Sequence, residues 1–140
     1  MRGLSWLLLL ALLVSGSKAM ATLAITGEVV IEPHAENIGQ TAVRSTGSGV
    51  RVRGRPLLDL LNEAEVNRVD AMKIDIEGFE VPVLEAFFNT ATPALWPRFV
   101  IAEIVGEGGL PLKELLVSRG YRLQHCTKMN GILVLPEATP

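Results

Sequence analysis

Two apolar-rich segments, each followed by a turn and a helical pattern, constrain the fold of this chain most. Residues 70–76 and 98–105 both have the composition and length of buried strands. After the first, apolar residues recur at helical spacing through Phe88, and after the second a helix is expected from Pro111 onward. Strands that alternate with helices imply a mainly parallel sheet covered by helices. The sequence therefore predicts an α/β fold.

The C-terminal end departs from this alternation. Residues 121–127 and 132–135 have the composition of strands, and Asn130-Gly131 lies between them. Asn-Gly between apolar runs is the strongest short signal for a β-hairpin. We therefore predict a mainly parallel sheet that ends in an antiparallel hairpin, with Gly120 as a left-handed cap of the preceding helix.

The region before residue 70 is less regular. Short strands are expected at residues 22–25, 29–31 and 50–52, and Pro56 is expected to open a helix. Residues 32–48 are rich in Gly, Asn, Ser and Thr, which predicts a long surface loop. Long loops inside a compact domain are often functional.

The first 21 residues allow two interpretations. The run from Leu4 to Val14 is apolar except for Ser5, and it is shorter than the roughly 20 residues that a membrane-spanning helix needs. With Arg2 before it and the small residues Ala19 and Ala21 on either side of Met20 after it, the run has the form of a cleavable export signal. The alternative is a buried strand or helix of a single domain that covers residues 1–140.

Composition excludes several classes of function. The formal net charge is -2 and the basic residues are scattered, so nucleic acid is not an expected partner. The densest basic group is Arg51, Arg53 and Arg55, whose alternation indicates the wet side of a strand. Cys126 is the single cysteine and there are two histidines, so no metal site is expected.

Acidic residues at the end of the strand over residues 70–76 are the first candidates for a site. Asp75 and Glu77 are two residues apart and share one face with Lys73, and Gly78 lets the backbone turn beside them. In open α/β sheets, ligands bind outside the carboxyl ends of the strands. The acids are thus candidates for acid and base chemistry or for ligand binding. The alternative is that they only cap the next helix.

A further acid, Glu103, lies near the end of the strand over residues 98–105. A carboxylate between apolar residues needs a partner if it is buried. Glu103 is expected either to face the same cleft as Asp75 or to pair with Arg98 or Lys113. Asn37, in the long loop, offers an amide group and is a further candidate for the substrate cleft, the alternative being that this loop is simply solvated.

Residues Lys73 to Glu80 resemble the signature of FkbM-type methyltransferases, which reads Lys-Ile-Asp-x-Glu-Gly-x-Glu. The family then has a Val-Leu helix, a Pro-containing link and an apolar strand that ends in Glu. Residues 83–84, 93–97 and 99–103 are similar to these parts. The resemblance extends over nearly the whole chain, and its most specific part is the signature.

The resemblance implies a partial Rossmann-like methyltransferase fold, S-adenosylmethionine as cofactor and methyl transfer, commonly to a hydroxyl oxygen. Asp75 and Glu77 would be catalytic, and both would bind the cofactor together with Lys73. The methyl acceptor would be a small molecule or a glycan. The protein would be cytoplasmic and would not associate with a membrane.

The family pattern also contains a strand, a Gly-rich turn and a second strand ending in an acid, all of which would precede Gly3. We therefore expect a single truncated domain that alone binds the cofactor weakly or not at all, and copies that associate to cover exposed sheet edges. Two other hypotheses are a non-catalytic binding protein on a reduced fold and a small exported protein that begins at Thr22.

Overall fold

The computed structural model describes residues 6–8, 20–23, 27–33, 41–44, 48, 50–76, 78–106 and 109–137. The strands are β1 (Trp6–Leu8), β2 (Met20–Leu23), β3 (Gly27–Pro33), β4 (Thr41–Arg44), β5 (Val50–Pro56), β6 (Ala71–Ile74), β7 (Phe99–Glu103), β8 (Arg122–Cys126) and β9 (Asn130–Val134). The helices are α1 (Leu57–Glu63), α2 (Glu80–Thr90) and α3 (Gly109–Ser118), with a short 3-10 helix η1 (Pro93–Leu95). Most of residues 1–21 lie outside the described residues, apart from β1 and the start of β2.

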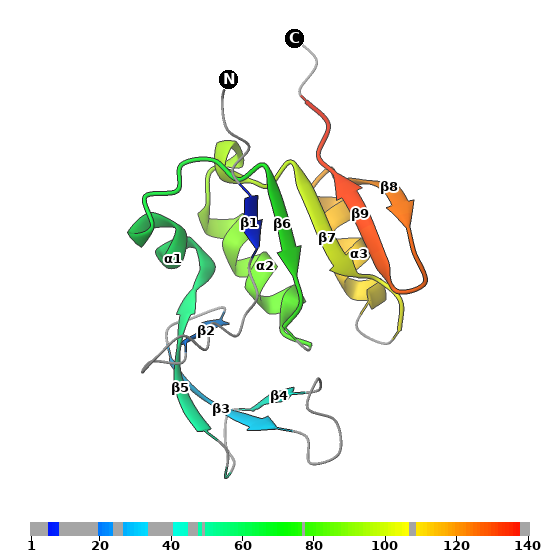
Figure 1. The fold of residues 1–140 in the computed structure, drawn as a ribbon. Helices are drawn as coiled ribbons and strands as arrows, with labels where there is room; N and C mark the ends of the chain where they lie inside the picture. The colour runs from blue at the N-terminus through cyan, green and yellow to red at the C-terminus, as the bar shows by residue number, and fades with distance from the viewer. Residues whose placement is uncertain are drawn as a thin grey trace.

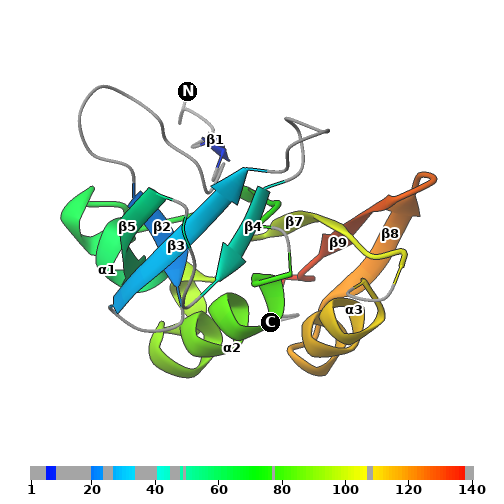
Figure 2. The same ribbon diagram turned by 90° about the horizontal axis from the view of Figure 1, so that it is seen from below.

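The larger sheet has five strands in the order β1-β6-β7-β9-β8. β1, β6 and β7 are parallel, whereas β9 is antiparallel to both of its neighbours. Figures 1 and 2 show α2 and α3 packed together on one face of this sheet. The predicted strand-helix alternation and C-terminal hairpin are confirmed here.

The smaller sheet has four strands in the order β2-β5-β3-β4, with one parallel pair and two antiparallel pairs. The predicted mainly parallel sheet is therefore correct only for β1, β6 and β7, because most strand pairs of the smaller sheet are antiparallel. β4 lies inside the segment that was expected to be a loop, and β3 extends to Pro33. Arg51 and Arg53 are exposed and Val52 is buried, which confirms the predicted wet side for these two arginines. Arg55 is partly buried and pairs with Glu63.

The core lies between the five-stranded sheet and its two helices. Alternate residues of β6, β7 and β9 point toward the helices, which is the two-residue period of a pleated strand. Met72, Val100 and Leu133 are 0% exposed, and they pack with Leu84 of α2 and Leu116 of α3. Burying each such side chain stabilises the fold by roughly 1.5–3 kcal/mol. This packing also determines that the residues between the buried ones lie on the opposite face of the sheet.

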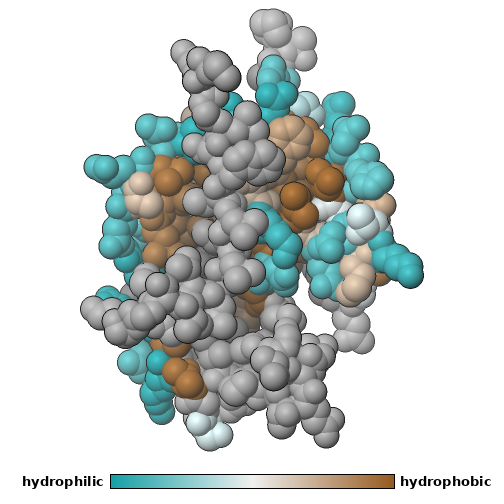
Figure 3. All heavy atoms as spheres, in the orientation of Figure 1, coloured by the Kyte–Doolittle hydropathy of each residue, from teal (hydrophilic) through white to brown (hydrophobic). Residues whose placement is uncertain are grey.

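The opposite face of the sheet carries the residues between the buried ones. Phe99 is 36% exposed, and Lys73 and Ile101 are half-buried. Figure 3 looks onto this side and shows apolar and polar surface next to each other. Within the described part of the chain, none of the helices combines the length and apolar composition needed to cross a bilayer.

The hairpin turn lies earlier than the Asn-Gly pair suggested. The amide and the hydroxyl of Thr127 both donate to the Asn130 carbonyl oxygen, at 2.8 and 3.1 Å, so the turn closes over residues 127–130. Gly131 is already in β9, and a Cβ atom there would lie 2.4 Å from Cδ1 of Ile104. The glycine is therefore explained by close packing and not by turn geometry.

A buried tyrosine ties the end of α3 to the link before β7. The Tyr121 hydroxyl donates a 2.6 Å hydrogen bond to the Pro97 carbonyl oxygen, and the ring lies 5.9 Å from that of Phe88. Burial raises the pKa of Tyr121 well above its usual range, so the group stays a neutral donor. Gly120, just before it, has φ +93°, which confirms the predicted left-handed cap.

Replacing Tyr121 with Phe keeps the ring but leaves the buried Pro97 carbonyl without this donor. We expect Tyr121→Phe to lower the free energy of unfolding by about 1–3 kcal/mol. The measurement is the urea midpoint, with Val117→Ala, at a 50% exposed position of α3, as control. The control should change stability by less than about 0.5 kcal/mol. Equal midpoints for Tyr121→Phe and the wild type would contradict the structural role given to this hydroxyl.

Candidate functional site

The carboxyl ends of β6 and β7 lie at the same edge of the five-stranded sheet. The two strands are parallel, with Ile74 in register with Ala102. Asp75 directly follows β6 and Glu103 is the last residue of β7, so each stands one residue beyond that pair. Two acids from different parts of the chain thus meet at the edge where ligands bind in open α/β sheets.

Lys73 and Asp75 form an ion pair on the face opposite the helices. Lys73 Nζ lies 2.8 Å from Asp75 Oδ2, and the two side chains are 34% and 46% exposed. Ile74 and Ile76, which alternate with them, are buried. The predicted sharing of one face is confirmed for Lys73 and Asp75. An ion pair with this exposure adds at most about 1 kcal/mol to stability.

The turn after Asp75 depends on Gly78. Its φ is +93°, a conformation that side chains disfavour, and the Phe79 amide donates a 3.4 Å hydrogen bond to the Ile76 carbonyl oxygen. Glu77, the second predicted acid, lies outside the described residues. The turn leads directly into α2 and places the signature residues between the sheet edge and the start of that helix.

Glu80 holds this turn from the first residue of α2. Its Oε1 accepts a 2.8 Å hydrogen bond from the Ile76 amide, and its Oε2 accepts a 2.9 Å bond from the Gly78 amide. The N-cap residue of α2 is Phe79, which has no side-chain capping bond, so the described residues show no helix cap from Asp75. Glu80 instead accepts hydrogen bonds from amides of the preceding turn. In the sequence, Glu80 was identified only as the last residue of the signature. Its position two residues after Gly78 was the one feature that could have indicated a contact with the turn.

Glu103 makes neither of the two ion pairs expected from the sequence. Arg98 instead pairs with Glu137 at 2.8 Å, and no ion pair joins Glu103 to Lys113 among the described residues. Glu103 is exposed and lies in register with Asn130 of β9. Of the two alternatives, the structure leaves Glu103 at the sheet edge near Asp75. Asn37 lies outside the described residues.

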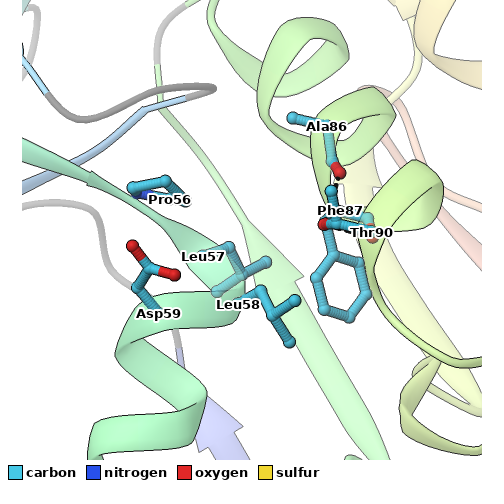
Figure 4. Close-up of a pocket in the computed structure, with 7 residues that line it drawn as sticks. All are labelled: Pro56, Leu57, Leu58, Asp59, Ala86, Phe87 and Thr90. Carbon is cyan, nitrogen blue, oxygen red and sulfur yellow. Dashed lines mark hydrogen bonds between the residues drawn. The ribbon is translucent and has the colours of Figure 1, made fainter.

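A cavity of about 190 Å³ lies elsewhere, between α1 and α2 (Figure 4). Its lining is mostly apolar, and Asp59 is the one ionisable side chain among the residues that line it: Pro56, Leu57, Leu58, Asp59, Ala86, Phe87 and Thr90. None of the predicted site residues lines it, so we place the candidate site at the strand ends. Within the described ranges, no three His, Cys, Asp or Glu residues are grouped to hold a metal ion.

An α/β chain with acids at the carboxyl ends of adjacent parallel strands is compatible with a methyltransferase-like fold. The family described as methyltransferase FkbM domain matches residues 10–123. The chain therefore belongs to the FkbM methyltransferase family, and this membership indicates methyltransferase activity. No curated protein and no solved structure gives a significant match to the chain.

Gly78 and Gly120 provide a matched test of the turn. Both have φ +93°, and a Cβ atom would meet nothing within 4 Å at Gly78 and only Leu135 Cδ1, at 3.6 Å, at Gly120. Replacing either with Ala should therefore cost a similar amount, about 1–2 kcal/mol, through backbone strain. Thermal unfolding measures this cost.

Only Gly78→Ala should also shift the side-chain NMR signals of Lys73 and Asp75, because only that turn adjoins the ion pair. Gly120→Ala is the control. If both variants left those signals unchanged, the turn would not position the pair.

Proposed function

We propose that this domain transfers a methyl group from S-adenosylmethionine to a hydroxyl oxygen of a small molecule or glycan. The observation that supports this most is the placement of the FkbM signature: Lys73 and Asp75 stand paired at the carboxyl end of β6, at the edge shared with β7. We infer that the five-stranded sheet corresponds to part of a Rossmann-like methyltransferase fold. The net charge of -2 gives no support to a nucleic-acid acceptor.

The charged groups at this edge suit the chemistry of the cofactor. S-adenosylmethionine carries an ammonium, a carboxylate, ribose hydroxyls and the sulfonium that supplies the methyl group. Asp75 is a carboxylate acceptor for a hydroxyl or ammonium, and Lys73 is a donor for a carboxylate or hydroxyl. Since both side chains are partly exposed, either can exchange its present partner for a ligand without leaving a buried charge unpaired.

The acceptor would approach from the same edge. A hydroxyl oxygen that attacks a methyl carbon must lose its proton, and a nearby carboxylate can accept it. Asp75 and Glu77 are the proposed acids and bases, and Glu103, exposed at the end of β7, is a proposed contact for the acceptor together with Asn37. Orientation of the two reactants at one edge is the main contribution that the fold makes to such a transfer.

Substituting Asp75 with Asn tests the site directly. The variant removes one negative charge and the ion pair with Lys73 while keeping the shape of the side chain. We expect the dissociation constant for S-adenosylmethionine to rise about tenfold, the effect of weakening one hydrogen bond to a charged group. Ligand-observed NMR titration measures this change even when binding is weak.

Asp59→Asn is the matched control, because Asp59 is an exposed acid on α1, at the cavity and not at the strand ends. It should leave the dissociation constant unchanged. Equal binding by the wild type and Asp75→Asn would contradict the role proposed for Asp75. No response of the wild type at high cofactor concentration, the outcome expected for a truncated domain, would contradict the proposal that this domain transfers the methyl group by itself. Binding without transfer to any hydroxyl acceptor would favour a non-catalytic binding protein.

A further inference from the structure

We propose that Glu80 is a positioning residue of this site, which fixes the backbone at Ile76 and Gly78 and so the place of Asp75, the residue before Ile76. The inference rests on the proposed function, because it concerns the same edge of the sheet. It assigns Glu80 no contact with the cofactor or the acceptor. Its role follows from the groups that its carboxylate already binds.

Both oxygens of the Glu80 carboxylate are occupied by the backbone. Oε1 accepts from the Ile76 amide at 2.8 Å and Oε2 from the Gly78 amide at 2.9 Å. These two amides flank Glu77 in the sequence, and Ile76 directly follows Asp75. Hydrogen bonds to an ionised carboxylate are shorter and stronger than bonds between neutral groups. The Glu80 side chain therefore fixes the backbone at Ile76 and at Gly78. Ile76 is the residue that directly follows Asp75.

Little else in the described residues holds this turn. The backbone bond that closes it, from the Phe79 amide to the Ile76 carbonyl oxygen, is 3.4 Å long, which is beyond the usual range. The Ile76 side chain is 5% exposed and fixes one end in the core, but Gly78 has no side chain and is exposed. Without the Glu80 contacts, the backbone at Gly78 would be free to sample other conformations, since glycine restricts the backbone least.

Only a carboxylate at this distance satisfies both amides. Gln has the same length but offers one acceptor oxygen, and its NH₂ group would face the N–H of the other amide. Asp is one methylene shorter. Glu80→Gln is therefore a nearly isosteric variant that keeps one contact and loses the other.

The experiment compares Glu80→Gln with Glu85→Gln in the full chain. Glu85 is an exposed glutamate of the same helix, so the control removes the same charge from α2 without touching the turn. Three quantities are measured for each protein: hydrogen exchange of the Ile76 and Gly78 amides, the dissociation constant for S-adenosylmethionine, and the unfolding midpoint.

In Glu80→Gln we expect exchange of at least one of the two amides to accelerate about tenfold, as for one lost bond to a charged group. The dissociation constant should rise by about tenfold as well, because small displacements of positioned groups weaken a site strongly. Glu85→Gln should match the wild type in both measurements. If binding weakens only in proportion to a lower unfolding midpoint, the role of Glu80 is merely structural and the proposal is wrong.

The outcomes separate this inference from the proposed function. Unchanged amide exchange in Glu80→Gln overturns the inference whatever the cofactor does. Faster exchange with unchanged cofactor affinity also overturns it, while leaving the proposed function intact. Failure of the wild type to bind S-adenosylmethionine contradicts the proposed function itself, and the exchange data then still report whether Glu80 holds the turn.

Discussion

Burial of one face of the five-stranded sheet against α2 and α3 is the constraint on which the rest of the structure depends. Met72, Ile74 and Ile76 point into that core, so the alternate positions of the same strand and turn must face the other way. Lys73 and Asp75 are therefore placed beside each other by the packing behind them, and their ion pair is a consequence of it. A shift of β6 by one residue would bury this pair and expose the isoleucines, which the core forbids.

Much of this half of the fold could be predicted from the sequence, because β6, α2, β7 and α3 have strong periodicity and are separated by Gly or Pro. β4 could not be predicted, since it lies in a polar segment whose strand character comes from pairing with β3. The hairpin was predicted but its turn was misplaced, because Gly131 serves the packing of Ile104 and not the turn.

For the candidate site, the relative placement of some of the proposed residues could be predicted, whereas their roles remain proposals. Spacing alone placed Lys73 and Asp75 on one face, and parallel strands brought Glu103 to the same edge. The contact of Glu80 with two backbone amides was missed, because a sequence does not show which amides remain unpaired in a turn. The partner of Arg98 was missed for a related reason, since Glu137 lies far from Arg98 in the sequence, beyond the last strand, and is brought next to it by the fold.

The position of β9 between β7 and β8 has a consequence for synthesis of the chain. Among the described strands, β8 pairs only with β9, although it is made first. Until residues 130–134 have emerged from the ribosome, β8 has no neighbour among the described strands, and β7 has an unpaired edge on the side that β9 will occupy. This part of the sheet is therefore completed only after those residues emerge from the exit tunnel, and until then the exposed edge of β7 is a place where chaperones or other nascent chains can pair.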